Sequence, residues 1–309
     1  MKKKNNGLIV IAAPDENGMT VRGILRQKQD VSQRLIKKII HGDSETTGAL
    51  YLNGKAARFN ERVKAGDEIR LVFPAERSWI QPEDIPISII YEDEDILVID
   101  KQPGIIVHPT KGYKCGTVAN AVIFHMTKRG EDYKPRFVSR LDMGTSGILI
   151  IGKNSHAQNN LSKQSASGGM EKFYITVLEG RLEDDLPPSG IIDIPIGQPN
   201  MDEPKRAALP EAQGGSKSQT AYEILKMVQG GEALTVVRAQ LLTGRTHQIR
   251  VHFAHYGHPV LGDHLYGSPS ALISRQALHA EEASFTHPVT GEKLVLNAPI
   301  PEDIGRIIG

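Results

Sequence analysis

A charged pair and a glycine turn interrupt an apolar run at residues 137–154, FVSRLDMGTSGILIIGKN. The apolar residues on both sides of the interruption would draw this segment into the interior as a strand. Arg140 and Asp142 lie inside it, and burying an unpaired carboxylate costs several kcal/mol. We therefore expect Asp142 to have a cationic partner, at a strand end where turn residues 144–147 supply backbone amides. Taken alone, the pattern favours a structural salt bridge over a catalytic carboxylate.

A second polar cluster changes that balance. In LLTGRTHQIRVHFAHYGHP, residues 241–259, a helix is predicted over 246–257, and polar side chains crowd its start: Arg245, His247, Gln248 and Arg250. His247 and Arg250 are three apart and share a face, while Ile249 and Phe253 form the packing face. Two arginines at a helix start bind anions, so this cluster would hold a phosphate or pair with Asp142.

The same segment contains the spacing HxxHxxH at His252, His255 and His258. Such a spacing could indicate a metal site. There is no HExxH glutamate, no cysteine lies nearby, and Gly257 breaks the helix before the third histidine. Packing and capping roles are therefore favoured, and no metal is predicted.

The first quarter of the chain is basic. Residues 1–75 contain 14 Lys and Arg against 8 Asp and Glu, whereas the remainder has 23 against 28, and the whole chain has a net charge of +1. A helix is predicted from Ser32 to a stop at Gly42, with residues 35, 36, 39 and 40 as its apolar face. Arg34, Lys37 and Lys38 fall largely on the other side. A strand, an Asn53-Gly54 turn and a second strand follow. A basic module of this kind either binds a polyanion or presents a solubilising surface.

The 309 residues, 39% of them hydrophobic, suffice for two cored domains. The polar, proline-containing residues 76–88 are predicted to be a linker. Beyond it, strands and helices alternate irregularly, and an irregular excursion is predicted at 181–219 between paired strands. The pattern predicts an α+β fold with a mixed sheet. Strands are predicted at 95–101, 172–180 and 233–242, and a helix at 117–130.

Cysteine content and hydropathy bear on the compartment. One cysteine, Cys115, allows no internal disulfide, which fits a reducing cytosol. The start, MKKKNNGLIVIAAPDENG, has lysines before an apolar run that is too short for a signal peptide. It is predicted to be a charged tail entering a first strand. No run approaches the roughly 18 apolar residues of a membrane span, so we expect a soluble, cytoplasmic protein. We also expect a monomer.

These motifs resemble those of a known family. SRLDMGTSG looks like the RLD-TSG motif of the RluA-type pseudouridine synthases, and YEDEDILVIDKQPGIIVHP resembles that family's upstream signature. EKFYITVLEG, with Tyr174, is similar to its tyrosine motif, and TGRTHQIRVHFAHYGHPVLGDHLYG to its most characteristic segment. The match runs from about residue 89 to 300. Residues 20–75 resemble an S-four-type RNA-binding domain, whose short basic helix grips RNA backbone.

The resemblance implies a mixed, largely antiparallel sheet with a central RNA cleft. It implies that uracil is detached from a uridine in RNA, turned and rejoined through carbon, without metal or cofactor. Asp142 would be the catalytic carboxylate, Tyr174 would contact the flipped base, and Arg250 would pair with Asp142. A larger set would bind RNA or support the site: Arg140, Arg245, His247 and Gln248, with Arg34, Lys37 and Lys38 in the N-terminal domain. Ser139 departs from the histidine that many members carry there, and KQPG from their commoner KPPG or KPAG.

Physical chemistry makes these roles coherent. An adjacent arginine would keep a carboxylate charged in a dry cleft, where it acts on positive character growing on the departing ribose. Flipping the uridine costs roughly a few kcal/mol, and stacking on an aromatic ring returns about 1 to 3 kcal/mol. Two other functions stay open: a non-catalytic RNA-binding or ribosome-assembly protein, and a hydrolase or phosphoryl-transfer enzyme with Asp142 as nucleophile. Large-subunit ribosomal RNA is the favoured substrate, with transfer RNA as the other.

Overall fold

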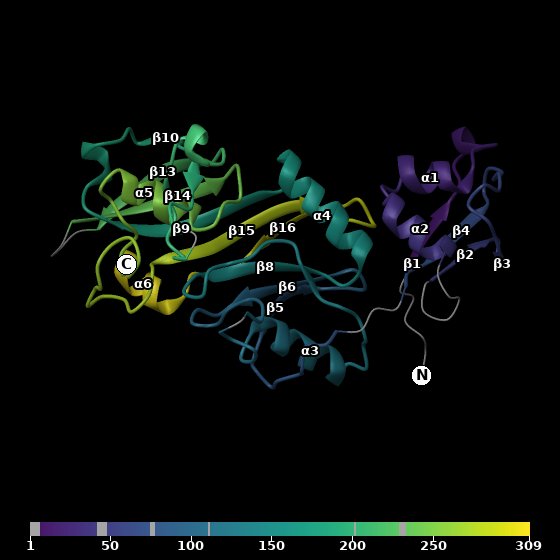
Figure 1. The fold of residues 1–309 in the computed structure, drawn as a ribbon, viewed down its shortest axis with the longest axis horizontal. Coiled ribbons are helices and arrows are strands. Elements are labelled where there is room, and N and C mark those ends of the chain that lie inside the picture. Colours follow the sequence, from purple (N-terminus) through teal and green to yellow (C-terminus); the bar gives the residue numbers. More distant parts are fainter. Residues whose placement is uncertain (1–6, 42–47, 75–77, 111, 201, 229–232) are drawn as a thin grey trace.

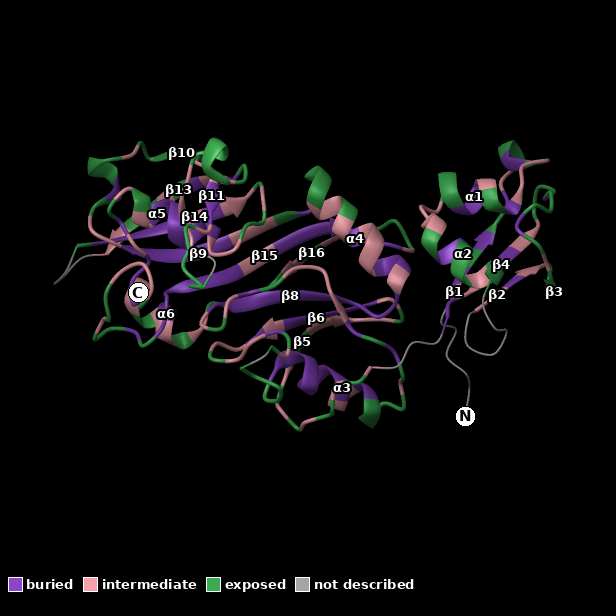
Figure 2. Ribbon diagram, viewed as in Figure 1, coloured by how far each residue is buried: buried purple, intermediate pink, exposed green. Residues whose placement is uncertain are grey.

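A computed structural model describes residues 7–41, 48–74, 78–110, 112–200, 202–228 and 233–309 of the chain. Two separate hydrophobic cores lie in these residues, one centred on residues 8–73 and one on residues 96–304 (Figure 2). The lysine-rich start and the helix stop predicted at Gly42 lie outside the described residues. Among the described residues, no helix is long and apolar enough to cross a membrane.

Residues 7–74, here called the N-terminal module, form an antiparallel sheet with strand order β1-β4-β2-β3 and two helices (Figure 1). The predicted Asn53-Gly54 turn joins β2 to β3, and both residues have positive φ, as tight hairpin turns require. Ser32 accepts a hydrogen bond from the Leu35 amide at the start of α2, as predicted. The elements are β1 (Gly7–Ile11), the 3-10 helix η1 (Pro14–Glu16), α1 (Val21–Gln27), α2 (Gln33–His41), β2 (Ala49–Leu52), β3 (Lys55–Ala56) and β4 (Glu68–Val72).

Helix α2 divides its residues between a core face and a basic face. Leu35 and Ile36 are buried in the core of the module, while Arg34, Lys37 and Lys38 are exposed. Ile40, predicted on the apolar face, is 43% exposed instead, because it lies in the last turn of the helix, where the core no longer covers it.

The rest of the chain is built on one large sheet with strand order β10-β13-β14-β9-β15-β8-β6-β5. All neighbours pair antiparallel except β15 and β8, so the predicted α+β fold with a mixed, largely antiparallel sheet is confirmed. Its strands are β5 (Ser88–Glu92), β6 (Ile96–Lys101), β8 (Ser146–Gly152), β9 (Glu171–Glu179), β10 (Ser189–Asp193), β13 (Gln219–Val228), β14 (Leu234–Leu241) and β15 (Leu278–Thr286). β7 (Arg136–Phe137) pairs with β8, and β16 (Lys293–Asn297) with β15.

Four helices accompany the sheet (Figure 1). They are α3 (Val118–Lys128), α4 (Ser155–Ser167), α5 (Gln248–His255) and α6 (Glu302–Ile308). Short elements complete this part: the 3-10 helices η2 (Leu182–Asp184) and η3 (Glu211–Gln213), and the two-stranded hairpin β11 (Ile196–Gly197) and β12 (Ala207–Ala208). The N-terminal module contacts α4 through an ion pair of Asp30 with Lys163 at 2.5 Å and through Phe73, which stacks on His156.

Strand β8 forms the middle of the large core, because all seven of its residues are buried (Figure 2). It is the strand predicted from the apolar part of the 137–154 segment. Gly147 at its start has φ +105°, and a Cβ there would lie 2.2 Å from the carbonyl oxygen of Ala280 on β15. Only glycine allows this close approach of the two parallel strands.

Most predicted elements of this part agree with the structure to within two residues, the uncertainty normal for element ends. Two predictions need correction. The region 181–219 is not wholly irregular, because it supplies edge strand β10, which pairs with β13, and the hairpin β11–β12. The helix predicted over 246–257 begins only at Gln248, because His247 has φ 58°, a left-handed conformation that an α-helix excludes.

Candidate active site

Asp142 lies in the turn between β7 and β8, with its side chain 21% exposed. Its Oδ2 accepts a hydrogen bond from Nη1 of Arg250 at 2.8 Å, although the residues are 108 positions apart. The ion pair that the sequence required of Asp142 is therefore present. Because the carboxylate is neither sealed in the core nor fully solvated, it can meet a ligand while keeping its partner.

Arg250 is held from its other side by Asp263, which is fully buried. Nε and Nη2 donate to the two carboxylate oxygens of Asp263 at 2.6 and 2.8 Å, a bidentate geometry that fixes the guanidinium. Burial alone would lower the pKa of Arg250, but the hydrogen bonds and charges of Asp263 and Asp142 raise it. Arg250 is thus a permanent cation presented at a fixed position to Asp142.

His247 is the second group beside Asp142, with Nε2 lying 3.7 Å from Oδ2. Its Nδ1 lies 2.8 Å from the hydroxyl of Tyr266, and that hydroxyl already accepts the Arg206 N–H. This contact fixes the position of the imidazole ring beside Asp142. Burial lowers the pKa of His247 despite the opposing charge of Asp142, so a neutral ring is favoured at pH 7.

Tyr174, on β9, lines the same cleft as Asp142 and is 6% exposed. Burial and the nearby Asp142 charge raise the pKa of its phenol, which stays protonated. The cleft has a volume of about 590 Å³, within the range of ligand pockets. It therefore has room for a nucleotide that enters between Tyr174 and the Asp142 turn.

The cleft is rimmed by four cations: Arg140, Lys172, Arg206 and Arg245. None of them forms an ion pair with a carboxylate of the described residues. Arg140 donates to the hydroxyl of Thr246, Arg245 to the Lys217 carbonyl, and Lys172 to the Ser165 hydroxyl. These contacts position the cations without neutralising them, so the rim can hold an anionic ligand.

Gln248 supports the site from within. Its Oε1 accepts from the Thr243 hydroxyl and the Arg245 amide at 2.8 and 3.0 Å. Its Nε2 donates to the Gln219 carbonyl and the Thr220 hydroxyl, both at 2.9 Å. Because the amide is fully engaged and buried, Gln248 anchors the turn before α5 to β13 and has no hydrogen-bonding group left for RNA.

Two buried basic side chains, Lys101 and Arg275, hold the backbone of the Asp142 turn. Lys101 is fully buried, and its Nζ donates to the carbonyls of Gln102 and Met143 at 2.8 and 3.2 Å. Arg275 donates to the Gly144 carbonyl at 2.9 Å and forms a bidentate pair with Asp303 of α6. The carbonyls on the C-terminal side of Asp142 are thereby held in place, which limits the positions that the carboxylate can take.

Lys101 gives a testable pH dependence. Burial and the Arg275 charge lower its pKa to about 7, against the raising effect of Asp142 and Asp100. The unfolded chain keeps the proton up to a pH of about 10.4, so the unfolded state binds more protons between these values. We expect the unfolding free energy of the wild type, relative to a Lys101→Met variant, to rise between pH 7 and 10 by up to about 1.4 kcal/mol per unit. Denaturant unfolding at pH 7, 8 and 9 measures this. Replacement of the exposed Lys226 by methionine is the control, and its pH profile should parallel that of the wild type. If the unfolding free energies of Lys101→Met and the wild type also changed in parallel with pH, the prediction would be wrong.

The histidine spacing HxxHxxH does not form a metal site. His252 bonds to the Thr220 hydroxyl and the Ile194 carbonyl, and His258 to the Glu179 carbonyl and Asp185. The packing role expected of these two histidines agrees with these contacts, which tie α5 and the turn after it to neighbouring elements.

One cluster of the described residues, Asp93, Asp95 and His287, has the spacing of a metal site. Hydrogen bonds already occupy it. Nδ1 of His287 accepts from the Thr290 amide at 3.0 Å, and its Nε2 lies 2.8 Å from Asp93. Asp93 also accepts from the Tyr91 hydroxyl and from the Asp95 and Ile96 amides, so its oxygens already have partners within the protein. The cluster joins the β5–β6 turn to the end of β15.

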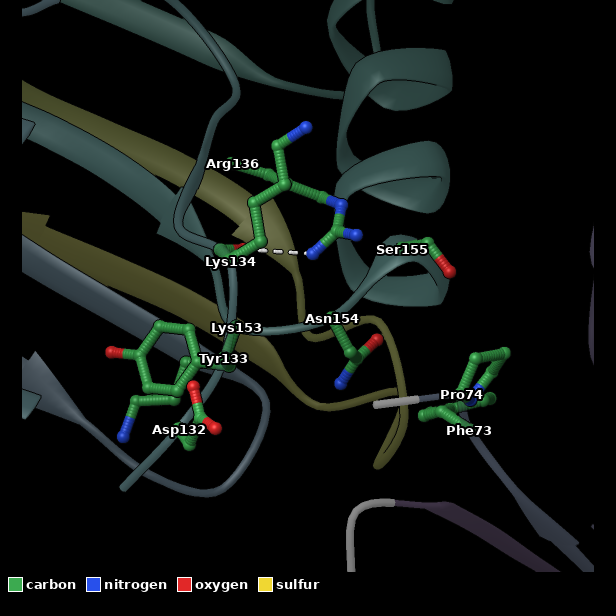
Figure 3. Close-up of a pocket in the computed structure, with 9 residues that line it drawn as sticks. All are labelled: Phe73, Pro74, Asp132, Tyr133, Lys134, Arg136, Lys153, Asn154 and Ser155. Atoms are coloured by element: carbon green, nitrogen blue, oxygen red, sulfur yellow. Dashed lines mark hydrogen bonds between the residues drawn. The ribbon is translucent and has the colours of Figure 1, made fainter. Parts of the chain in front are cut away.

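A small concavity at the N-terminal end of α4 is equally satisfied (Figure 3). Its volume is about 10 Å³, room for about one water molecule. Lys153 donates to Glu92 at 2.7 Å and to Glu131 at 3.2 Å, and Asn154 caps α4. We therefore assign the concavity a structural role. Phe73 and Pro74 of the N-terminal module line it together with residues of the large domain.

The structure gathers most of the predicted site residues and separates three. Asp142, Tyr174, Arg250, Arg140, Arg245, His247 and Gln248 line one hollow. Arg34, Lys37 and Lys38 lie on α2, in the N-terminal module at the other end of the molecule from α5 (Figure 1). Several residues that contribute to the site were not among the predicted ones: Lys101, Lys172, Arg206, Asp263, Tyr266 and Arg275. Asp263 could have been predicted, because a buried Arg250 needs a second carboxylate to accept the hydrogen bonds that Asp142 leaves unmade.

Comparisons with known proteins identify the family of the chain. Residues 95–255 match the family model described as RNA pseudouridylate synthase. The chain is 34% identical to the uncharacterized RNA pseudouridine synthase YhcT of Bacillus subtilis (strain 168), over 99% of this chain and 98% of that protein. It is 34% identical to the ribosomal large subunit pseudouridine synthase D of Xanthomonas campestris pv. campestris, over 85% and 81%. The solved structure of human RNA pseudouridylate synthase domain containing 1 superposes with a TM-score of 0.57 at 25% identity, over 70% and 84%. The chain thus belongs to the RluA-type family of RNA pseudouridine synthases, isomerases that convert uridine in RNA to pseudouridine.

Proposed function

We propose that this isomerase modifies specific uridines of large-subunit ribosomal RNA and that Asp142 is its essential carboxylate. The observation that carries the proposal is the Asp142–Arg250 ion pair, at the wall of a cleft that also holds Tyr174 and is rimmed by cations. The ribosomal substrate is supported by the names of two relatives, both called ribosomal large subunit pseudouridine synthase D, at 34% and 33% identity.

The uridine must leave its helix before it meets Asp142, because base pairing and stacking shield the sugar and the glycosidic bond. Extrusion costs a few kcal/mol, which contact of the base with Tyr174 and contact of phosphates with the rim offset. Arg140, Lys172 and Arg245 lie where the phosphates next to an extruded nucleotide would pass. Binding energy from the RNA backbone thereby stabilises the flipped state.

The carboxylate of Asp142 then acts where the bond between uracil and ribose breaks. Positive character grows on the ribose in this step, and a carboxylate in a water-poor cleft stabilises it more strongly than one in bulk water. Arg250 pairs with Asp142 and orients it, and Asp263 keeps Arg250 in place. The neutral His247 lies near the same oxygen and does not add a second full charge.

The N-terminal module is proposed to be an S-four-like RNA-binding domain covering residues 1–75, joined by a linker at 76–88 to a catalytic domain at 89–309. Its separate core and the exposed basic face of α2 support this division. The basic face would hold RNA backbone at a distance from the cleft, so that affinity comes from both domains while the chemistry comes from one.

Charge reversal on α2 tests the module. We expect Lys37→Glu combined with Lys38→Glu to weaken binding of ribosomal RNA and to lower the slope of log affinity against log salt by about 2, because two phosphate contacts are lost. Turnover at saturating RNA should stay within about twofold, since the catalytic cleft is unchanged. Filter binding at several salt concentrations, together with single-turnover kinetics, measures both quantities.

The matched control is Lys55→Glu with Lys64→Glu, two exposed lysines of the same module that lie outside α2. Both double variants change the net charge equally, so only a local contact distinguishes them. Equal salt slopes for the two double variants would show that the module contributes general charge and no specific contact.

Mapping of pseudouridines tests the function as a whole. The protein is incubated with RNA from cells that lack its gene, and new pseudouridines are located by chemical mapping. We expect one or a few new sites in large-subunit ribosomal RNA, and none with Asp142→Asn. New sites only in transfer RNA would reject the ribosomal substrate and keep the chemistry, whereas bound RNA without any product would reject catalysis.

A further inference from the structure

A second cavity, here called the hairpin cavity, adjoins the active-site cleft. Its volume is about 400 Å³, comparable to that of small-ligand pockets. Arg206, Arg245 and Thr246 line both it and the cleft, so these three residues form the wall between the two spaces. The remaining lining comes from β11 and the segment after β12: Ile196, Gly197, Gln198, Gln213, Gly214 and Ser216.

The wall carries positive charge that the protein does not neutralise. Arg206 is part of the β11–β12 hairpin, and its Nη1 donates to the side-chain oxygen of Gln198. Its Nε is buried and has no hydrogen-bond partner within the described part of the chain. A guanidinium has five N–H donors. Among the described residues Arg206 uses one of them, on Nη1, so the other donors on its two Nη atoms can bind a ligand, whereas the buried Nε cannot. Arg245 uses its Nε on the Lys217 carbonyl and likewise keeps its other donors.

The hairpin is also fixed to the catalytic centre. The backbone N–H of Arg206 donates to the Tyr266 hydroxyl at 2.8 Å, and this hydroxyl bonds to His247 beside Asp142. The Tyr266 ring also lies 5.0 Å from the guanidinium of Arg250. The wall between the two cavities therefore has a set position relative to Asp142, which is what a neighbouring subsite requires.

We propose that the hairpin cavity receives the nucleotide next to the isomerised uridine and that Arg206 binds the phosphate between them. The inference rests on the proposed function, because a uridine in the cleft is covalently joined to its neighbours. Each neighbour brings one phosphate, and the shared wall presents two arginines where the chain must cross. Gln213 and Ser216 line this cavity, whose size suits a nucleotide, so the cavity contributes to the choice of uridine by its sequence context.

The first test measures binding without turnover. Proteins carrying Asp142→Asn, alone or with Arg206→Gln or Lys205→Gln, are titrated with large-subunit ribosomal RNA. Lys205 is the matched control, because it is the adjacent, exposed cation of the same hairpin and lines neither cavity. We expect Arg206→Gln to lower affinity about tenfold and the salt slope by about 1, and Lys205→Gln to change affinity less than twofold. Equal affinities of the two would overturn the inference.

The second test uses turnover on a short RNA that spans a mapped uridine. Arg206→Gln should raise KM about tenfold with kcat nearly unchanged, and Arg206→Lys should restore the salt slope but only part of the affinity, since it keeps the charge and loses the planar fork. An abasic nucleotide on one side of the uridine should raise KM for the wild type. Unchanged KM with abasic nucleotides on either side would reject the cavity alone, whereas a wild type that isomerises no uridine would reject the proposed function.

Discussion

Asp142→Asn is expected to lower single-turnover isomerisation by about four orders of magnitude, the upper range for removal of one catalytic acid or base group. The substitution keeps the size of the side chain and removes its charge. Arg250 keeps its bidentate partner Asp263, so the fold should lose little stability. RNA affinity should be unchanged or slightly higher, because the cleft that receives a polyanion loses one negative charge.

Three measurements separate the role of Asp142 from a structural one: the rate of pseudouridine formation, RNA affinity, and the thermal midpoint. Asp84→Asn is the control, since it makes the same chemical change at a side chain that is 72% exposed. Its ion pair with Lys128 is long, at 3.9 Å, and lies on the surface. It should leave all three quantities unchanged. If Asp142→Asn kept more than a tenth of the wild-type rate, Asp142 would not be the essential carboxylate.

The strands of the large sheet could be predicted where their own residues carried the signal. The run at 148–151 is apolar on both faces because β8 is covered on both. Such a run predicts a central strand even when its partner strands are not yet identified. Helix α4 shows the opposite case. Its sequence, SHAQNNLSKQSAS, has few apolar residues, so no periodicity marked it, although buried His156, Ala157 and Leu161 hold it against the core.

The order of the strands was beyond reach of local patterns. β15 lies between β9 and β8, roughly 100 and 130 residues away in sequence, and pairs antiparallel with one and parallel with the other. That choice is made by side-chain packing across the whole sheet, for example where Gly147 meets Ala280. Propensity and turn chemistry describe each strand alone and do not encode which strands meet.

The site shows the same division. The need of Asp142 for a cation followed from the cost of burying a charge, and residues 245–250 offered the candidates. The sequence did not show that Arg250 is shared between two carboxylates, or that the Tyr266 hydroxyl lies within hydrogen-bond distance of His247. These links join segments through the tertiary fold, so only coordinates display them.

Arg250→Met is the second change with a large expected effect, because it acts on both stability and activity. Asp263 is fully buried and would lose its ionic partner, and breaking a buried pair in this way costs about 3 to 5 kcal/mol. Isomerisation should fall below detection, because Asp142 loses the cation that orients it. Urea unfolding at pH 7 measures the loss of stability, and pseudouridine formation measures the activity.

The pH dependence of this loss identifies its cause. In the wild type, burial tends to raise the pKa of Asp263, but hydrogen bonds and charge from Arg250 lower it overall. That contribution to stability is present above the unfolded pKa of about 3.9 and disappears as the pH falls through the folded value. Without Arg250, burial raises the pKa of Asp263, so the variant takes up a proton on folding and its deficit should shrink from pH 7 toward pH 4.5.

Adding Asp263→Asn to Arg250→Met should recover most of the stability at pH 7, since Asn can still accept hydrogen bonds from the Leu265 and Tyr266 amides. It should recover none of the activity. A double variant as unstable as Arg250→Met alone would show that lost packing, and not the unpaired charge of Asp263, causes the destabilisation.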